Sequence, residues 1–554
     1  MKFDIRTVCM GCLLVPVAFF APAQAQTLPP ELQQRPQVFD PNLDRERSRQ
    51  LQEEDEERSR ANRIEVPALN ADQPDPELLP EGDQRFTLKS IRFNASSFLS
   101  DEWLQSVAGQ YVGREIGFED LNELLLEINR EYRERKLLTA RAIIPPQQIR
   151  NGELRVVLVE AKIDGVEWVN KPERVSERFY RSRLPELQTG SVLQTNRLLD
   201  ALQRLNATTP GPMLSADLKA GDEFGTTRVL LDPVEPGRIN AQLLANNYGS
   251  ESSGEWQYGS VGEWNSPLGW GDSLSWAAIA TEGTVYGDLE YRVPVNRYNG
   301  GIYAGYSRNN LEVINGPYTD LGIEGESQVW RLGFNQPWWL DAAWMLEGGF
   351  EYNSSQSETT FEGDIPLSET EVDRMQASLA VQFRQAPWYV RYVQNVVFAD
   401  TTNLITGDEG DYQTFKGNLY SQRSVGETVR LVIKSRWQYA LEDQTLPSTL
   451  LFQLGGPSSV RGYVSGVVSA PHGIDASLET HWQFTPGWET SLLIDAGYAD
   501  DENLLEDTLA SVGLGLQYRW NKRLTVNTVY SAAMTDVVPD QDSGQLLFQT
   551  TWKF

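Results

Sequence analysis

From Ile239 to the end of the chain, hydrophobic and polar residues alternate with a period of two. Between residues 511 and 520, apolar side chains hold the even positions, and serine, glycine, glutamine and arginine hold the odd ones. This period places successive side chains on opposite faces of a β-strand, whereas a helix has a period of 3.6. We therefore predict about sixteen antiparallel strands of about ten residues each, near 239–249, 256–265, 272–281, 284–293, 300–310, 327–336, 343–353, 374–385, 388–399, 412–421, 428–440, 475–484, 489–498, 509–520, 523–533 and 545–554.

Two features favour lipid as the environment of the apolar face. Aromatic residues stand at its ends, as they do where barrels meet the membrane interface; they include Trp482, Tyr518, Trp520 and Trp552. The connections alternate between short turns and longer, more acidic segments, which are 311–326, 354–373, 400–411, 441–474, 499–508 and 534–543. Short turns on the periplasmic rim are typical of bacterial outer-membrane barrels. We predict a membrane β-barrel over 236–554 with an inserted loop at 441–474. The alternative is a soluble β-sandwich, in which the apolar face would form a core.

Upstream of the barrel, residues 85–162 and 163–235 repeat one order of elements. In each segment a strand is followed by two stretches of helical spacing and then by two short strands. We therefore predict two small α+β modules in tandem. Both ends of an even-stranded barrel lie on its periplasmic side, so the modules are expected in the periplasm.

Residues 1–25 are typical of a cleaved secretory signal peptide. Lys2 and Arg6 precede an apolar stretch, and a small-x-small cleavage signal ends at Ala25. Cys9 and Cys12 lie within this segment and are the only two cysteines. The mature chain is therefore expected to have neither disulfides nor reactive thiols.

The N-terminal segment 26–63 contains a polar stretch, 45–63, with Glu and Arg at helical spacing and hardly any apolar face. One interpretation is a solvated or disordered helix. The other is a plug helix in a water-filled, charge-lined cavity, where no apolar stripe is needed. Residues 64–84 contain four prolines among acidic residues and are expected to form a stiff linker.

The charge balance and the absent motifs exclude several classes of function. The 554 residues include 48 basic and 77 acidic ones, a net charge of −29, which disfavours nucleic acid as a partner. Beyond residue 25 no apolar run is long enough for a transmembrane helix. His472 and His481 lie apart from paired acids at metal-ligand spacing, and no nucleotide-binding or hydrolase motif occurs. We expect no enzymatic activity, no catalytic residues, no metal site and no cofactor.

The longest connection contains a glycine-rich motif that separates this barrel from others. It reads Leu-Gly-Gly-Pro-Ser-Ser from residue 454, followed by Val460, Arg461, Gly462 and Tyr463. Together with the tandem modules and the polar helix, this motif resembles the outer-membrane transporters of two-partner secretion (TpsB-type, similar to haemolysin-activator and filamentous-haemagglutinin transporters). These belong to the superfamily that combines POTRA (polypeptide-transport-associated) domains with a barrel. The segment around Asp495 and Gly497 is similar to that family's strand motif.

Arg461 at the tip of a loop folded into the lumen would be partly desolvated and would need a carboxylate. Alternation along 489–498 places Asp495 on the polar, lumen-facing side. The resemblance implies the same pairing, a bidentate contact between Arg461 and Asp495 on the lumen wall. A solvated loop arginine and an unpaired lumenal aspartate are the alternatives, and Tyr463 could equally be ordinary packing.

The resemblance implies a pore that recognises an unfolded, TpsA-like secreted exoprotein and moves it from the periplasm to the cell surface. It also implies contacts with outer-membrane lipid and lipopolysaccharide, and dependence on the barrel-assembly machinery for insertion. The partner-binding residues within the POTRA-like modules remain unassigned. A membrane-protein assembly factor of the same superfamily is the first alternative, and a passive porin or surface adhesin is the second.

Overall fold

The computed structural model describes residues 41–62, 69–71, 79, 82, 84–208, 212–316, 319–341, 343–361, 365–441, 446–501, 505–521, 523–538 and 541–554. The predicted signal peptide, 1–25, and most of the predicted linker, 64–84, lie outside the described residues. In the part of the chain that is described, no helix is long and apolar enough to cross a membrane.

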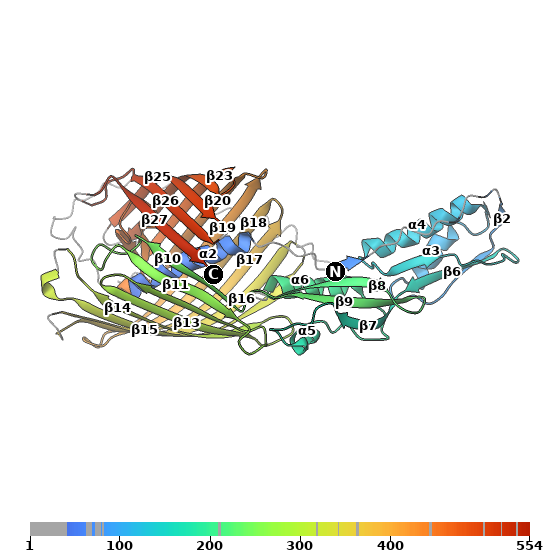
Figure 1. Cartoon of the computed structure of the whole chain (residues 1–554), viewed down its shortest axis with the longest axis horizontal. Coiled ribbons are helices and arrows are strands. Elements are labelled where there is room, and N and C mark those ends of the chain that lie inside the picture. The colour runs from blue at the N-terminus through green and yellow to red at the C-terminus, as the bar shows by residue number, and fades with distance from the viewer. Residues whose placement is uncertain are drawn as a thin grey trace. The chain divides into compact units, whose positions relative to one another are not determined.

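Sixteen antiparallel strands close into a barrel, which confirms the predicted fold class (Figure 1). The barrel closes where β10 pairs with β27, with Leu243 opposite Trp552. The strands are β10 (Ile239–Asn246), β11 (Gln257–Asn265), β12 (Ser273–Ala280), β13 (Thr284–Pro294), β14 (Gly301–Glu312), β15 (Glu324–Leu340), β16 (Trp344–Phe361), β17 (Ile365–Gln385), β18 (Trp388–Asn403), β19 (Glu409–Val425), β20 (Val429–Ala440), β23 (His472–Thr485), β24 (Trp488–Asp501), β25 (Leu505–Trp520), β26 (Leu524–Ala533) and β27 (Gly544–Lys553).

The predicted strand length of about ten residues is wrong for the strands in the middle of the barrel. β17 has 21 residues and β16 has 18, so most of the predicted connection 354–373 is strand. Its residues are polar on both faces, yet they pair in register, for example Gln356 with Glu371. Strands pair through backbone hydrogen bonds, which do not require an apolar face. The part of a strand that extends beyond the bilayer does not contact lipid and so has no apolar face. The alternation pattern therefore ended before the strands did.

The two faces of the barrel differ in polarity. Large apolar residues point outward and are exposed, among them Trp330 and Leu514. Small polar residues such as Ser307 and Ser531 point inward and are buried. Outward apolar bands with aromatic ends suit lipid, and a polar interior suits an aqueous lumen.

The first module comprises β2 (Phe86–Thr87), β3 (Ser90–Phe93), α3 (Asp101–Gly109), β4 (Glu115–Ile116), α4 (Phe118–Glu134), β5 (Ala140–Ile143) and β6 (Glu153–Glu160). Its main sheet has the order β3-β6-β5. The Ser100 hydroxyl accepts a hydrogen bond from the Trp103 amide and so caps α3. Apolar residues at helical spacing on α4, including Leu124 and Ile128, are buried in the core of this module.

The second module comprises β7 (Lys162–Trp168), α5 (Glu177–Arg183), α6 (Thr195–Thr208), β8 (Met213–Ala220) and β9 (Thr226–Val234). Its sheet has the order β1-β8-β9-β7, in which β1 is the linker segment Leu69–Ala71. β1 pairs in parallel with β8, with Asn70 opposite Asp217. The linker therefore covers one edge of the second module's sheet.

Candidate functional site

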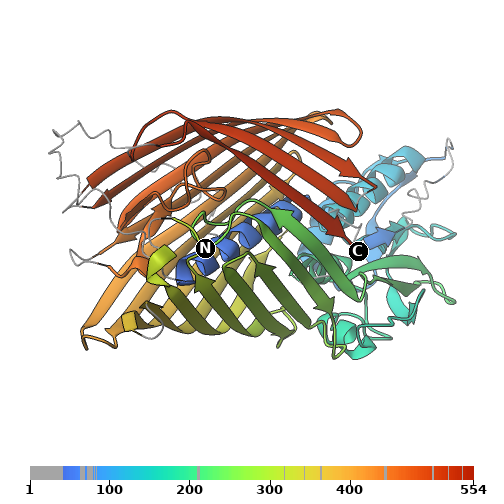
Figure 2. The same cartoon turned by 60° about the vertical axis from the view of Figure 1, so that its left-hand side comes forward.

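The polar helix α2 (Pro41–Ala61) lies inside the barrel (Figures 1 and 2). The sequence left open a solvated helix or a helix inside a charged cavity. In the structure the helix lies inside the charged cavity of the barrel. In the first half of α2, Arg49 lies 3.6 Å from Glu351 on β16. At the start of the helix, the Asn309 side chain on β14 donates to the Pro41 carbonyl at 2.8 Å. Contacts to the wall replace the apolar packing that an amphipathic helix would need.

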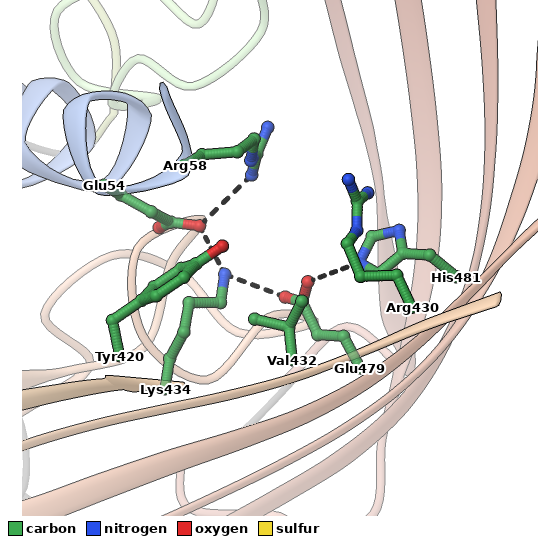
Figure 3. A pocket seen from close by; sticks show the side chains of 8 residues that line it. All are labelled: Glu54, Arg58, Tyr420, Arg430, Val432, Lys434, Glu479 and His481. Carbon is green, nitrogen blue, oxygen red and sulfur yellow. Dashed lines mark hydrogen bonds and ion pairs between the residues drawn. The ribbon is translucent and has the colours of Figure 1, made fainter. Parts of the chain in front are cut away.

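The second half of α2 is acidic and faces basic residues on β18 and β20. Glu57 lies 3.0 Å from Arg391 and accepts a hydrogen bond from the Tyr389 hydroxyl at 3.0 Å. Glu54 is paired with Lys434 (Figure 3). Ion pairs and hydrogen bonds therefore hold this half of the helix against the wall.

The inserted loop between β20 and β23 folds into the same lumen. It contains a short hairpin of β21 (Phe452–Leu454) and β22 (Val468–Ala470). Gly455, Gly456 and Gly462 have φ angles of 95°, 91° and 92°, a left-handed region that strongly favours glycine. These glycines allow the turns that bring Val460 and Arg461 to the wall.

The structure brings Arg461 and Asp495 together. Arg461 donates from Nε to Asp495 Oδ2 at 2.7 Å and from Nη2 to Oδ1 at 2.6 Å, a bidentate geometry. The same guanidinium donates to Ser477 Oγ at 2.7 Å, and its Nη1 lies 2.9 Å from Glu479. Arg461 is 8% exposed and Asp495 1%, so each charge is removed from bulk water and compensated by the other.

The other residues of the two motifs pack around this ion pair. Val460 and Leu454 lie against Gly497, where an added Cβ would come within 2.9 Å of both side chains. The Tyr463 hydroxyl donates to the Ala510 carbonyl at 2.7 Å, and its ring is buried. Gly497 thus provides the space for the loop, and Tyr463 both packs and ties the loop to β25.

Glu479 is a site residue that the sequence reasoning missed. Its carboxylate lies 2.9 Å from Arg461 of the loop and 2.8 Å from Lys434, the residue that also pairs with Glu54 of α2 (Figure 3). Loop, wall and helix therefore share one group of charges. Alternation along β23 places Glu479 on the polar face with Asp475, a signal that could have identified it.

His481 has two carboxylates beside it, although the sequence shows no paired acids at metal-ligand spacing around it. Its two ring nitrogens each lie 2.9 Å from a carboxylate, one from Glu479 and one from Glu489. Residues 479 and 481 share a face of β23, and pairing with β24 brings Glu489 beside them. Across the described ranges, no cluster of three or more histidine, cysteine and acidic side chains has a geometry that could hold a metal ion.

Comparisons with known proteins agree with this architecture. A family model described as haemolysin secretion/activation protein ShlB/FhaC/HecB matches residues 225–518, and a ShlB-type POTRA domain model matches residues 86–161. The heme/hemopexin transporter protein HuxB of Haemophilus influenzae (strain 86-028NP) is 22% identical, over 83% of this chain and 86% of its own. The outer membrane transporter CdiB of Dickeya dadantii is also 22% identical, over 80% and 82%.

Solved structures share the fold. CdiB from Escherichia coli superposes with a TM-score of 0.70 at 17% identity, covering 96% of this chain and 100% of that one. CdiB from Acinetobacter baumannii gives 0.66 at 16% identity with the same coverage. The closed barrel and the α+β modules are therefore a shared architecture.

Proposed function

Because the chain belongs to the haemolysin secretion/activation protein family ShlB/FhaC/HecB, we propose that it is the pore of a two-partner secretion system. It recognises an unfolded partner exoprotein in the periplasm and translocates it to the cell surface. Members of this family are transport proteins rather than enzymes. The barrel lies in the bacterial outer membrane, and the POTRA domains lie in the periplasm.

The observation that carries the proposal is a lumen filled by a polar helix. A sixteen-strand barrel is wide enough for an aqueous channel, and α2 occupies that space through contacts such as those of Glu54, Glu57 and Arg49. Pairs of this kind are individually weak where water can reach them. The helix can therefore leave the lumen without exposing an apolar face, and the pore opens when the partner arrives.

The second POTRA domain offers an edge for an extended segment of the partner. Strand addition supplies main-chain hydrogen bonds to an unfolded polypeptide whatever its side chains. The edge of β8 is covered by β1, which has only three residues. A longer strand of the partner would form more hydrogen bonds than β1 and would displace it.

The energy for export comes from the partner. No nucleotide is available outside the inner membrane, so translocation draws on partner binding in the periplasm and on partner folding at the surface. The loop that carries Arg461 stays fixed to the wall or rearranges as the chain passes, while the barrel remains closed against lipid.

The test is to delete the gene and compare culture supernatants with those of a complemented strain. Loss of one large secreted protein, restored by the complete chain, supports the proposal. Depletion of many outer-membrane barrels would instead indicate an assembly factor. An unchanged supernatant and an unchanged outer membrane would indicate a passive pore or an adhesin, and both of these results would overturn the proposal.

A further inference from the structure

Four adjacent strands line one side of the lumen with basic residues. On β17 to β20 the inward positions alternate with outward apolar ones such as Leu379 and Ile433. We call the inward cations the basic stripe: Arg374, Arg384, Arg391, Lys416, Arg430, Lys434 and Arg436. Among the described residues of these four strands, no carboxylate shares that face.

Among the described residues, carboxylates on flanking strands balance four members of the stripe. The wall pairs are Arg391 with Glu347, Arg430 with Glu489, Lys434 with Glu479 and Arg436 with Asp475. Glu46 of α2 lies 3.3 Å from Arg374 and within electrostatic range of Lys416. Arg384 donates to the Arg60 carbonyl of α2 at 2.5 Å. Of the remaining three cations, Arg374 therefore forms an ion pair with the helix, Lys416 lies near the same carboxylate, and Arg384 is held by a neutral carbonyl.

An acidic stretch of polypeptide already lies on the basic stripe. Residues 53–57 of α2 are all Glu or Asp. Glu57 reaches Arg391, and Glu54 reaches Lys434 (Figure 3). The neighbouring strand β16 carries the other sign: its Glu351 lies 3.6 Å from Arg49 of the helix. The wall is therefore complementary to the helix, with cations beside its acidic residues and a carboxylate beside Arg49.

We propose that the basic stripe is a binding track for acidic stretches of the exported polypeptide, and that α2 occupies it as an intramolecular stand-in. The proposal rests on the proposed function and adds the chemistry of the cargo. When α2 leaves, the seven cations of the stripe keep four paired wall carboxylates, in a lumen bounded by lipid. Low-dielectric walls strengthen such a field, and it acts over about 10 Å at 0.1 M salt. Several weak cationic sites in a row can bind a passing acidic polypeptide and still release it.

The first test measures ion selectivity in planar bilayers with the full-length chain. A variant with Glu54→Gln and Glu57→Gln weakens the hold on α2 and leaves the wall unchanged, so that openings become frequent. Under a KCl gradient these openings should be anion-selective. Adding Arg374→Gln, Arg384→Gln and Lys416→Gln removes three positive charges from the lumen. The reversal potential should then shift towards the value for a cation-selective pore. The matched control, Glu351→Gln on the neighbouring strand β16, removes a carboxylate and should shift the reversal potential towards anion selectivity. Cation-selective openings of the parent would overturn the proposal.

The second test uses a peptide as the cargo probe. A synthetic peptide of residues Glu46–Arg60, which includes the positions nearest to Arg374, Arg384 and Lys416, should block the open variant, and raising the salt should weaken the block. The variant that also lacks Arg374, Arg384 and Lys416 should need a roughly tenfold higher peptide concentration for half block, because each ion pair contributes modestly to binding. A peptide with glutamine at every acidic position should block poorly. Equal block by both peptides, or equal block of the two pores, would refute the track.

A third readout separates this proposal from the proposed function. Each variant is first shown to be folded by its heat-modifiable mobility on gels. If the culture supernatant depends on the chain but the triple variant exports normally and binds the acidic peptide as tightly as its parent, the track is refuted and secretion stands. If no secreted protein depends on the chain, secretion is refuted, whatever the selectivity of the pore.

Discussion

Replacing Asp495 with asparagine should release the loop tip from the barrel wall. Asp495 accepts three hydrogen bonds from Arg461, from the backbone N at 3.2 Å, from Nε at 2.7 Å and from Nη2 at 2.6 Å. Removing one partner of a buried ion pair costs about 3–5 kcal/mol. Glu479 remains 2.9 Å from Arg461, so we expect the lower end, about 3 kcal/mol. At 1.4 kcal/mol per factor of ten, the detached population should rise roughly 10²-fold.

The assay follows the reactivity of a cysteine at the loop tip. Val460 is fully buried, so in a Val460→Cys parent a maleimide reacts only after the loop detaches. The labelling rate then reports the detached population. Ser477→Ala is the matched control, because it removes one neutral acceptor from the same guanidinium, 2.7 Å away. It should raise the rate roughly tenfold, for a loss of about 1.5 kcal/mol.

A double-mutant cycle separates the ion pair from packing. In an Arg461→Gln background, Asp495→Asn should add little, because the partner is already gone. If Asp495→Asn alone labels at the rate of the parent, the packing of Val460 and Leu454 on β24 holds the loop, and the reasoning from the ion pair is refuted.

Three further predictions test the helix, the loop and the linker. Glu54→Gln with Glu57→Gln should raise the frequency of channel openings in bilayers. Glu56→Gln should not, because it removes only a pair with Arg60 at the exposed side of α2. Equal effects of the two variants would contradict the wall contacts. Gly462→Ala should destabilise the loop by about 1–2 kcal/mol, since its φ is 92°, and faster cysteine labelling measures this; an unchanged rate would argue against the strained turn. Asn70→Asp sets a second carboxylate against Asp217, whose oxygen now accepts from Asn70 at 3.0 Å, so amide exchange at 216–218 should accelerate; unaltered protection there would mean that β1 does not need this bond.

The strands could be predicted because their pattern is local. A membrane strand shows one face to lipid and one to water, so residues such as Leu514 and Gly515 record their orientation in the sequence. The outer parts of β16 and β17 could not be predicted, since both of their faces carry mainly polar residues and show no apolar alternation. Only the pairing of each strand with its neighbour, as between Gln356 and Glu371, defines them.

The site divides in the same way. The sequence alone determined the barrel, the two modules, the polar helix and the position of Asp495 on a polar face, because each depends on spacing along one segment. Only the tertiary structure decided that Glu479 serves the loop and the wall together, that His481 sits between two carboxylates, and that an acidic run of α2 lies on basic strands. The physical reason is that electrostatic partners are chosen by distance in space, and the closure of the barrel brings together charges that are hundreds of residues apart.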